Sequence, residues 1–480
     1  MDRPGGGDPA ARMAQAAQRL VDALVERGAS RVSEIHHAFP REVRAGLARI
    51  ERTDERPVPG LQRMDLDAHP GHNTAAERPE RGADDHRTAF RSDCVRWEGY
   101  KPCPEQKKQR LPDCSGCNRY EPGESVLDVQ AMPYDPSILE SAERVGIVEM
   151  GGLGSILRTT AISDALRQMN PQVGITWFTH RRGADLLRYV PGVVAVDTTR
   201  LTRADYMDIV PDLDALLNFE LSDSARDIVA GSRHVGGFAL NPQGKFQGVM
   251  PHAQGIQRLQ IDDAYRKANE STMQEILMES VGLGHMEPRY DIRLTDQNYE
   301  RAESVLRDIF GGNRPDDLIG LNIGTSEKGS LRRWPAESHA ALAGRLADRF
   351  PDKGIVILSG PEDSAVRNRV ISALPRYDNI AVLPTVDVGD FMAVLDRSRL
   401  VVTGDTFGMH AARAQDTPTL ALAGPMPHRE LELSPKDELI GPKLGCSPCY
   451  HRCSQPIAGL CMQDISVDEV ATKAVRMLDS

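Results

Sequence analysis

The stretch from Leu400 to Ala414 joins an apolar run directly to a helical pattern of small residues through Gly404-Asp405-Thr406. This order predicts a buried parallel strand whose carboxyl end opens into the start of a helix. Backbone N–H groups at Thr406 to Met409 and the positive end of the helix dipole would then point beyond the sheet edge, where a phosphate binds well. The structural alternative is a turn that caps itself with Asp405 and Thr406.

Length and charge narrow the class of protein. A chain of 480 residues suggests two or three domains at ~150 residues per domain. The net charge of −11 argues against a general nucleic-acid binder. No run approaches the ~18 apolar residues of a membrane span, and the first residues lack the apolar core of a signal peptide. We expect a cytoplasmic protein and leave peripheral association with the inner membrane open.

Short apolar runs alternate with helical patterns from residue 144 onward. The strands expected in the first series are 145–150, 175–179, 193–196, 215–219 and 235–238, with helices at 156–167 and 272–281. Those expected in the second series are 318–323, 355–360, 400–403 and 419–423, with helices that start at Pro335 and at the N-cap Asp387. Such alternation predicts an α/β fold with two doubly wound parallel sheets, one in 140–312 and one in 313–480, facing a cleft.

Three further segments precede the first sheet. Residues 1–52 carry helical patterns, at Ala11 to Glu26 and again after Pro40, and predict a small helical appendage. Residues 53–92 hold hardly any apolar side chains, which predicts a flexible linker. Residues 93–120 form a cysteine-rich module.

The eight cysteines fall into two groups of four. The first group is Cys94, Cys103, Cys114 and Cys117, and the second is Cys446, Cys449, Cys453 and Cys461. In a reducing cytosol such clusters favour metal ligation over disulfides, and four thiolates suit tetrahedral zinc or iron. We therefore expect structural zinc or iron at one or both clusters, with unliganded structural cysteines as the alternative.

Three strand ends in the second half carry matching polar groups. Thr325 and Ser326 offer hydroxyls, Arg332 offers a fixed cation, and the segment from Asp405 to His410 offers the start of a helix. Together these groups suit a diphosphate. Arg332 as a solvated helix-start cation and His410 as a packed histidine are the structural alternatives. The chain has no GxxxxGK[ST] loop, which excludes a P-loop NTPase.

The ordered motifs resemble those of the ADP-heptose:lipopolysaccharide heptosyltransferases, the glycosyltransferases of family 9. The resemblance covers roughly residues 144–475. It is carried by Gly151 to Thr160, Ile175 to Thr179, Arg332 to Pro335, Leu358 to Asp363, Gly404 to Ala412, Gly424-Pro425, and Cys446 to Met462. The module at 93–120 also looks like one that precedes the catalytic domains in a bacterial subset of these proteins.

The resemblance implies a GT-B fold and an inverting transfer of a heptose-like sugar from a nucleotide diphosphate donor, ADP-linked in this family. The acceptor hydroxyl could belong to a saccharide, a protein or a small molecule, and no catalytic metal is expected. The donor-binding residues implied are Thr325, Ser326, Arg332, Asp405, Thr406, Phe407, Gly408, Met409, His410 and Gly424. Gly151, Gly154 and Arg158 would belong to the acceptor-side loop.

The first glycine loop departs from the family. The family usually has aspartate, the expected general base, at the position of Ser155, and commonly has lysine at the position of Glu149. Arg332 likewise stands where the family has a lysine. A serine cannot accept a proton as a carboxylate can, so we expect either that Glu149 supplies the base or that the acceptor needs less assistance from a base. A catalytically degenerate GT-B protein, which binds a nucleotide sugar or serves as an assembly partner, is the alternative, and a GT-B epimerase or phosphorylase is a third.

Overall fold

The protein is described by a computed structural model, in which residues 91–97, 103–109, 111, 114–125, 127, 133–312, 315–325, 327–374, 376–449 and 459–479 are placed well enough to describe. The expected helices within residues 1–52, almost all of the linker at 53–92, Ser326 and Cys453 lie outside this set. The described residues belong to one compact unit, from Phe90 to Ser480.

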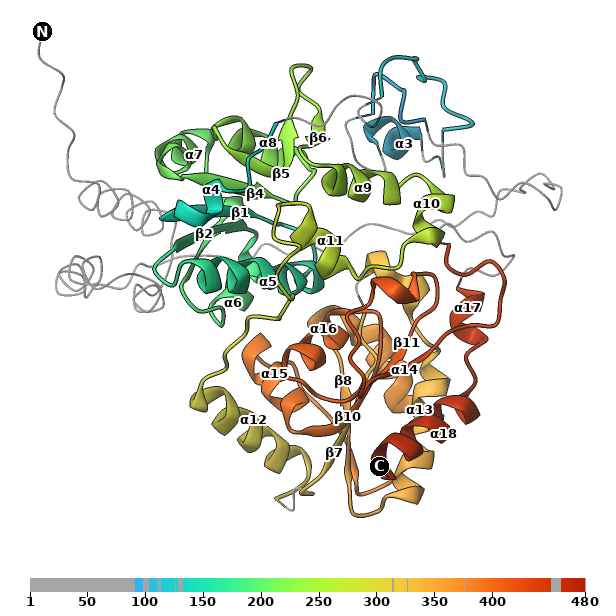
Figure 1. The fold of residues 1–480 in the computed structure, drawn as a ribbon. Coiled ribbons are helices and arrows are strands. Elements are labelled where there is room, and N and C mark those ends of the chain that lie inside the picture. Colours follow the sequence, from blue (N-terminus) through green and yellow to red (C-terminus); the bar gives the residue numbers. More distant parts are fainter. Residues whose placement is uncertain are drawn as a thin grey trace, which may run out of the picture. The chain divides into compact units, whose positions relative to one another are not determined.

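The first sheet has six strands in the order β3-β2-β1-β4-β5-β6 (Figure 1). Its strands are β1 (Arg144–Val148), β2 (Gly174–Thr179), β3 (Val193–Asp197), β4 (Ala215–Asn218), β5 (Val235–Leu240) and β6 (Phe246–Gly248). All neighbours are parallel except β5 and β6. Its helices and those that follow it are α5 (Leu153–Met169), α6 (Arg181–Leu187), α7 (Arg203–Ile209), α8 (Asp223–Ala230), α9 (Pro251–Leu259), α10 (Asp263–Ala268), α11 (Met273–Glu279) and α12 (Asp296–Ile309).

The second sheet repeats this plan with the order β12-β11-β10-β7-β8-β9. Its strands are β7 (Leu318–Asn322), β8 (Gly354–Leu358), β9 (Ile380–Val382), β10 (Ser398–Gly404), β11 (Thr419–Leu422) and β12 (Glu438–Ile440), all of them parallel to their neighbours. Its helices are α13 (Ala336–Arg349), α14 (Ser364–Ala373), α15 (Val388–Asp396), α16 (Phe407–Ala414), α17 (Leu460–Gln463) and α18 (Val467–Asp479). Two short helices, α3 (Pro104–Gln109) and α4 (Ile138–Ser141), precede the first sheet.

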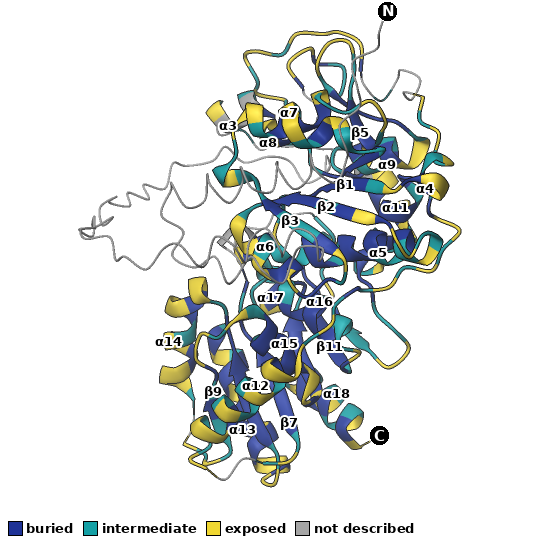
Figure 2. Cartoon of the chain, turned by 90° about the vertical axis from the view of Figure 1, so that its left-hand side faces the viewer, coloured by how far each residue is buried: buried dark blue, intermediate teal, exposed yellow. Residues whose placement is uncertain are grey.

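Burial explains why the strands read as continuous apolar runs. The strands of both sheets are mostly dark blue in Figure 2, while yellow residues lie on the outer sides of the helices. Every residue of β7 and β8 is buried. Parallel strands covered by helices on both faces need apolar side chains on both faces, as these two strands show. Among the described residues, no helix is both long and apolar enough to cross a membrane.

The structure confirms the long strands and corrects several boundaries. Helix α5 begins at Leu153, so Gly154 and Ser155 lie in its first turn and not in the expected loop. Pro335 is the N-cap of α13 and not its first helical residue. The strands β6, β9 and β12 were not predicted, because each has only three residues and lies at or beside a sheet edge.

Each sheet reverses its winding direction once. In the first sheet the reversal lies between β1 and β4, and in the second it lies between β7 and β10. Ligands of doubly wound sheets bind beyond the carboxyl ends of the strands at such a switch point. The chain therefore has two candidate binding edges, one in each domain.

A glycine beside the first switch point offers a test of this local fold. Gly237 has a φ of +77°, and a Cβ there would lie 2.3 Å from the carbonyl oxygen of Asn218 at the end of β4. Gly311 has a φ of +63° but no atom within 4 Å of a Cβ. We expect Gly311→Ala to cost about 1–2 kcal/mol of unfolding free energy through backbone strain alone. Gly237→Ala should cost clearly more in urea denaturation, and equal costs would contradict the clash.

Candidate functional site

The second switch point gathers the groups expected to bind a diphosphate. Asp405 follows β10 directly and is buried. Arg332, at the end of the short helix Glu327–Arg332, places its Nη1 3.1 Å from Asp405 Oδ2. The Arg332 Nε is buried and has no hydrogen-bond partner in the structure. A partly buried guanidinium with a donor that has no protein partner favours an anionic ligand at this place.

Helix α16 does not cap itself. Thr406 is its N-cap residue, but the Thr406 side chain makes no capping hydrogen bond. That hydroxyl instead accepts a hydrogen bond of 3.0 Å from Asn322 Nδ2 at the end of β7. The structure therefore contradicts the self-capping alternative, and the start of α16 keeps its capacity for an anion.

Close packing explains two of the glycines expected at the donor site. A Cβ at Gly408 would lie 2.3 Å from Asn322 Nδ2, so only glycine lets α16 approach β7. A Cβ at Gly424 would lie 2.3 Å from the sulfur of Met462. Packing within the protein therefore explains the glycine at both positions, independently of any contact with a ligand.

The other donor-side residues divide into two kinds. Thr325 is buried beside Arg332, and its N–H donates to Asp363 over 3.1 Å. The Phe407 ring stacks on Phe391, with ring centroids 6.0 Å apart, and the Met409 side chain is fully buried in an apolar cluster. The side chains of Phe407 and Met409 therefore hold α16 in place, which leaves their backbone groups as the parts that can contact a ligand.

The first switch point holds a buried carboxyl. Glu149 follows β1, and its Oε1 accepts the N–H of Gly151 over 2.7 Å. Burial raises the pKa of Glu149 to about 8, and the negative charge of Glu220 acts in the same direction. A Cβ at Gly151 would lie 2.6 Å from Glu149 Oε1 and 3.4 Å from Ser155 Oγ. Glu149 and Ser155 therefore flank the same small space.

Two residues that the sequence analysis did not single out hold this loop. Glu220, two residues beyond β4, accepts the N–H of Met150 over 3.2 Å. His180 Nε2 lies 2.8 Å from the carbonyl oxygen of Gly151, while His180 Nδ1 accepts the N–H of Gly183. The ring therefore donates through Nε2. The turns after β1, β2 and β4 are thus tied together at one edge.

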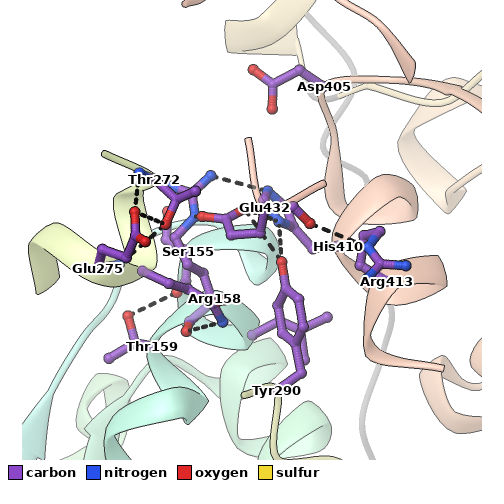
Figure 3. A network of polar contacts seen from close by, with 12 residues as sticks. Ser155, Arg158, Thr159, Thr272, Glu275, Tyr290, Asp405, His410, Arg413 and Glu432 are labelled. Carbon is purple, nitrogen blue, oxygen red and sulfur yellow. Dashed lines mark hydrogen bonds and ion pairs between the residues drawn. The ribbon is translucent and has the colours of Figure 1, made fainter. Parts of the chain in front are cut away.

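A buried polar network joins α5 to α16, and Figure 3 shows Arg158, Tyr290 and Glu432 directed at His410. Arg158 Nη2 lies 3.2 Å from His410 Nε2, and the Tyr290 hydroxyl lies 3.0 Å from His410 Nδ1. Arg158 Nε lies 2.7 Å from Glu432 Oε1. The structure thus places two predicted site residues, Arg158 and His410, in direct contact. Tyr290 and Glu432 were missed, because neither stands in a motif.

The cysteine clusters remain without a defined metal centre. In the part of the chain that the structure describes, no three or more His, Cys, Asp or Glu side chains are arranged to hold a metal ion. Burial raises the pKa of Cys114, and the charges of Cys103, Cys117 and Cys94 act in the same direction. The four side chains of the first group thus lie near one another, but not as a closed ligand set. The structural zinc or iron stays a prediction.

Comparison with known protein families finds a similarity that spans the end of the first domain and most of the second. Residues 250–456 match the model of "Glycosyltransferase family 9 (heptosyltransferase)". This part of the chain is similar to glycosyltransferase family 9. A comparison with curated protein sequences finds no match.

Solved structures agree on the fold. A family 9 glycosyltransferase from Veillonella parvula has 17% sequence identity over 73% of this chain and 99% of its own, with a TM-score of 0.57. The E. coli ADP-heptose lps heptosyltransferase II has 18% identity over 70% of this chain and 98% of its own, with a TM-score of 0.53. At this identity the likeness shows the fold, and the expected GT-B architecture is confirmed. Family and fold together support a sugar transferase.

The environment of Glu149 predicts how stability changes with pH. Since the pKa is near 4.5 in the unfolded chain and about 8 in the folded one, the folded protein binds more protons between these values. Stability contributed by the neutral carboxyl is therefore present below about pH 4.5 and lost as the pH rises through 8. The change in unfolding free energy caused by Glu149→Gln should therefore be more stabilising at pH 9 than at pH 4.5, by up to about 4 kcal/mol.

Urea denaturation at the two pH values measures this difference, and the exposed Glu140→Gln serves as the control. A Glu149→Gln effect that does not depend on pH would contradict the buried, neutral carboxyl.

Proposed function

We propose that this protein is an inverting glycosyltransferase that moves a heptose-like sugar from an ADP-linked donor to a hydroxyl acceptor. The observation that carries the proposal is the position of Arg332 and Asp405. They lie at the switch point of the second sheet, inside the segment that matches the family model, and they form an ion pair of 3.1 Å. A nucleotide diphosphate would place its phosphates there, against Arg332 and the start of α16.

The charges of this site suit a diphosphate leaving group. As the bond between the anomeric carbon and the diphosphate oxygen breaks, negative charge grows on that oxygen. Arg332 and the N–H groups of α16 are already positioned to interact with this charge. Their interaction stabilises the transition state. Asp405 holds the guanidinium in position, since the two side chains are paired and Asp405 is buried. Thr325 and Ser326 stay proposed donor contacts on the loop after β7.

Glu149 is proposed as the general base. It takes the proton of the acceptor hydroxyl while that oxygen attacks the anomeric carbon from the face opposite the diphosphate, which inverts the configuration. A carboxyl whose pKa is about 8 is closely matched to proton transfer near neutral pH. Ser155, in the first turn of α5, can orient the same hydroxyl by a hydrogen bond.

A degenerate binding protein is the second candidate, and Ser155 is the observation that favours it. Such a protein would bind ADP at the second switch point and release no ADP from any of a panel of nucleotide sugars. Turnover with any donor of the panel would exclude this candidate.

Loss of the cation at the second switch point should weaken nucleotide binding. Removing a charge-assisted hydrogen bond costs about 1.5–3 kcal/mol, so Arg332→Met should bind ADP about 10- to 100-fold more weakly than wild type. Isothermal titration with ADP measures the change. The control is Arg349→Met. Arg349 is an exposed residue at the end of α13, and it pairs with Asp479. Unchanged affinity in Arg332→Met would remove Arg332 from the donor site.

The pH–rate profile tests the base. If Glu149 acts only when ionised, kcat should rise about tenfold per pH unit up to a pKa near 8 and then level off. Glu149→Gln should lose about 10²–10⁴-fold in kcat while it still binds ADP. A Glu149→Gln enzyme with wild-type kcat and the same pH profile would show that another group takes the proton.

A further inference from the structure

Both ring nitrogens of His410 are engaged by protein groups. The side chain is buried, with Arg158 Nη2 at 3.2 Å from Nε2 and the Tyr290 hydroxyl at 3.0 Å from Nδ1. An arginine side chain can only donate hydrogen bonds, so Nε2 must be the acceptor. The ring proton therefore sits on Nδ1, where the Tyr290 oxygen and Glu432 Oε2, 3.3 Å away, can accept it.

Glu432 supplies the negative charge of this network. Its Oε1 lies 2.7 Å from Arg158 Nε as an ion pair, although neither atom makes a well-aligned hydrogen bond. Its Oε2 accepts from the Tyr290 hydroxyl over 3.3 Å, and its backbone oxygen accepts from Arg413. Burial favours the neutral carboxyl, but the positive charge of Arg158 and the hydrogen bond from His410 outweigh burial and hold the pKa of Glu432 well below its usual range. The network thus contains one fixed cation, one fixed anion and a neutral histidine.

The network connects the two switch points. Arg158 lies on α5, whose first turn carries Ser155, and His410 lies on α16, which starts directly after Asp405-Thr406. A Cβ at Gly154 would lie 2.8 Å from His410 Cδ2 and 3.7 Å from Phe407 Cα. The starts of the two helices are therefore in van der Waals contact beside the buried ion pair.

We propose that Arg158, Tyr290, His410 and Glu432 form an interdomain clamp that sets the spacing between the two switch points. Within the clamp, His410 is a positioning residue held as the Nδ1–H tautomer, and it is not a ligand of the diphosphate. The clamp itself depends on contacts within the protein, and only its effect on transfer rests on the proposed function.

Burial of both partners distinguishes this contact from other ion pairs between residues 140–312 and 313–480. The side chains of Arg182–Glu362 and Arg188–Asp387 are 37–56% exposed, and Arg301 is 42% exposed in its pair with the buried Asp390. Arg158 and Glu432 are only 16% and 5% exposed. Water and salt screen exposed pairs, which contribute little. Removal of one partner from a buried pair leaves an uncompensated charge. Loss of Arg158 or Glu432 should therefore loosen the domain contact more than loss of one partner of Arg182–Glu362 or Arg188–Asp387.

Hydrogen exchange of the ligand-free, full-length protein tests the clamp directly. The variant R158M leaves the buried Glu432 without its cation, and we expect exchange at least about 10-fold faster than wild type in both α5 and α16. The double variant R158M/E432M leaves no unpaired ion in the interior and should exchange more slowly than R158M. The control R182M should exchange as wild type does. Unchanged exchange in α5 and α16 of R158M would overturn the clamp.

The tautomer of His410 is a second test that does not depend on the double variant. In the full-length protein labelled with ¹⁵N-histidine, the His410 signal is assigned by its loss in H410Q. We expect a neutral ring with its proton on Nδ1. A ring protonated on Nε2, or on both nitrogens, would contradict the contact with Arg158.

Titration with ADP separates the clamp from the proposed function. We expect H410Q to bind ADP within about threefold of wild type, because the side chain at position 410 contacts the clamp and not the phosphates, whereas R332M loses at least about tenfold. A loss in H410Q as large as in R332M would make His410 a donor ligand and overturn its positioning role. If wild type itself binds no ADP, the proposed function fails, while exchange and the His410 tautomer still decide the clamp.

Discussion

The contact between α5 and α16 at Gly154 is the constraint on which the site depends. Each helix begins at the switch point of its own sheet, and the positive ends of both helix dipoles meet there. Such an arrangement is unfavourable unless negative charge lies near it. Glu432 supplies a buried carboxylate next to both helices, paired with Arg158. The same excess of positive potential would attract the phosphates of a donor.

The pKa values of two buried glutamates at this site are shifted in opposite directions, because their surroundings differ. Glu432 faces the cation Arg158 and keeps its charge at any physiological pH, so it acts as a fixed part of the structure. Glu149 is buried beside the acid Glu220, and these two effects outweigh the backbone N–H that it accepts from Gly151, so its charge is disfavoured. A carboxyl that titrates near neutral pH suits proton transfer, whereas one locked as an anion suits positioning. The two proposed roles follow from this difference.

The long strands and the donor-side motif could be predicted from the sequence, because buried parallel strands and their turns leave local patterns. Asp405 and Arg332 were found in this way, and they lie together at the second switch point. The three-residue strands β6, β9 and β12 were not predicted, since three residues are too few to show a hydrophobic period. Tyr290 and Glu432 were not predicted for another reason. Several of their contacts join residues that are more than 100 positions apart in the chain.

The residues at positions 149 and 155 differ from those of the family that the sequence resembles, and the two differences together leave the local charge the same. The family that the sequence resembles commonly has lysine where Glu149 stands and aspartate where Ser155 stands, a pair with no net charge. Here a carboxyl that is mainly neutral at pH 7 and a hydroxyl keep the same local charge. Both side chains flank the space above Gly151, so a carboxyl at either position would face the same space. Glu149, the proposed proton acceptor, has a pKa of about 8 and therefore ionises at a higher pH than an ordinary carboxyl.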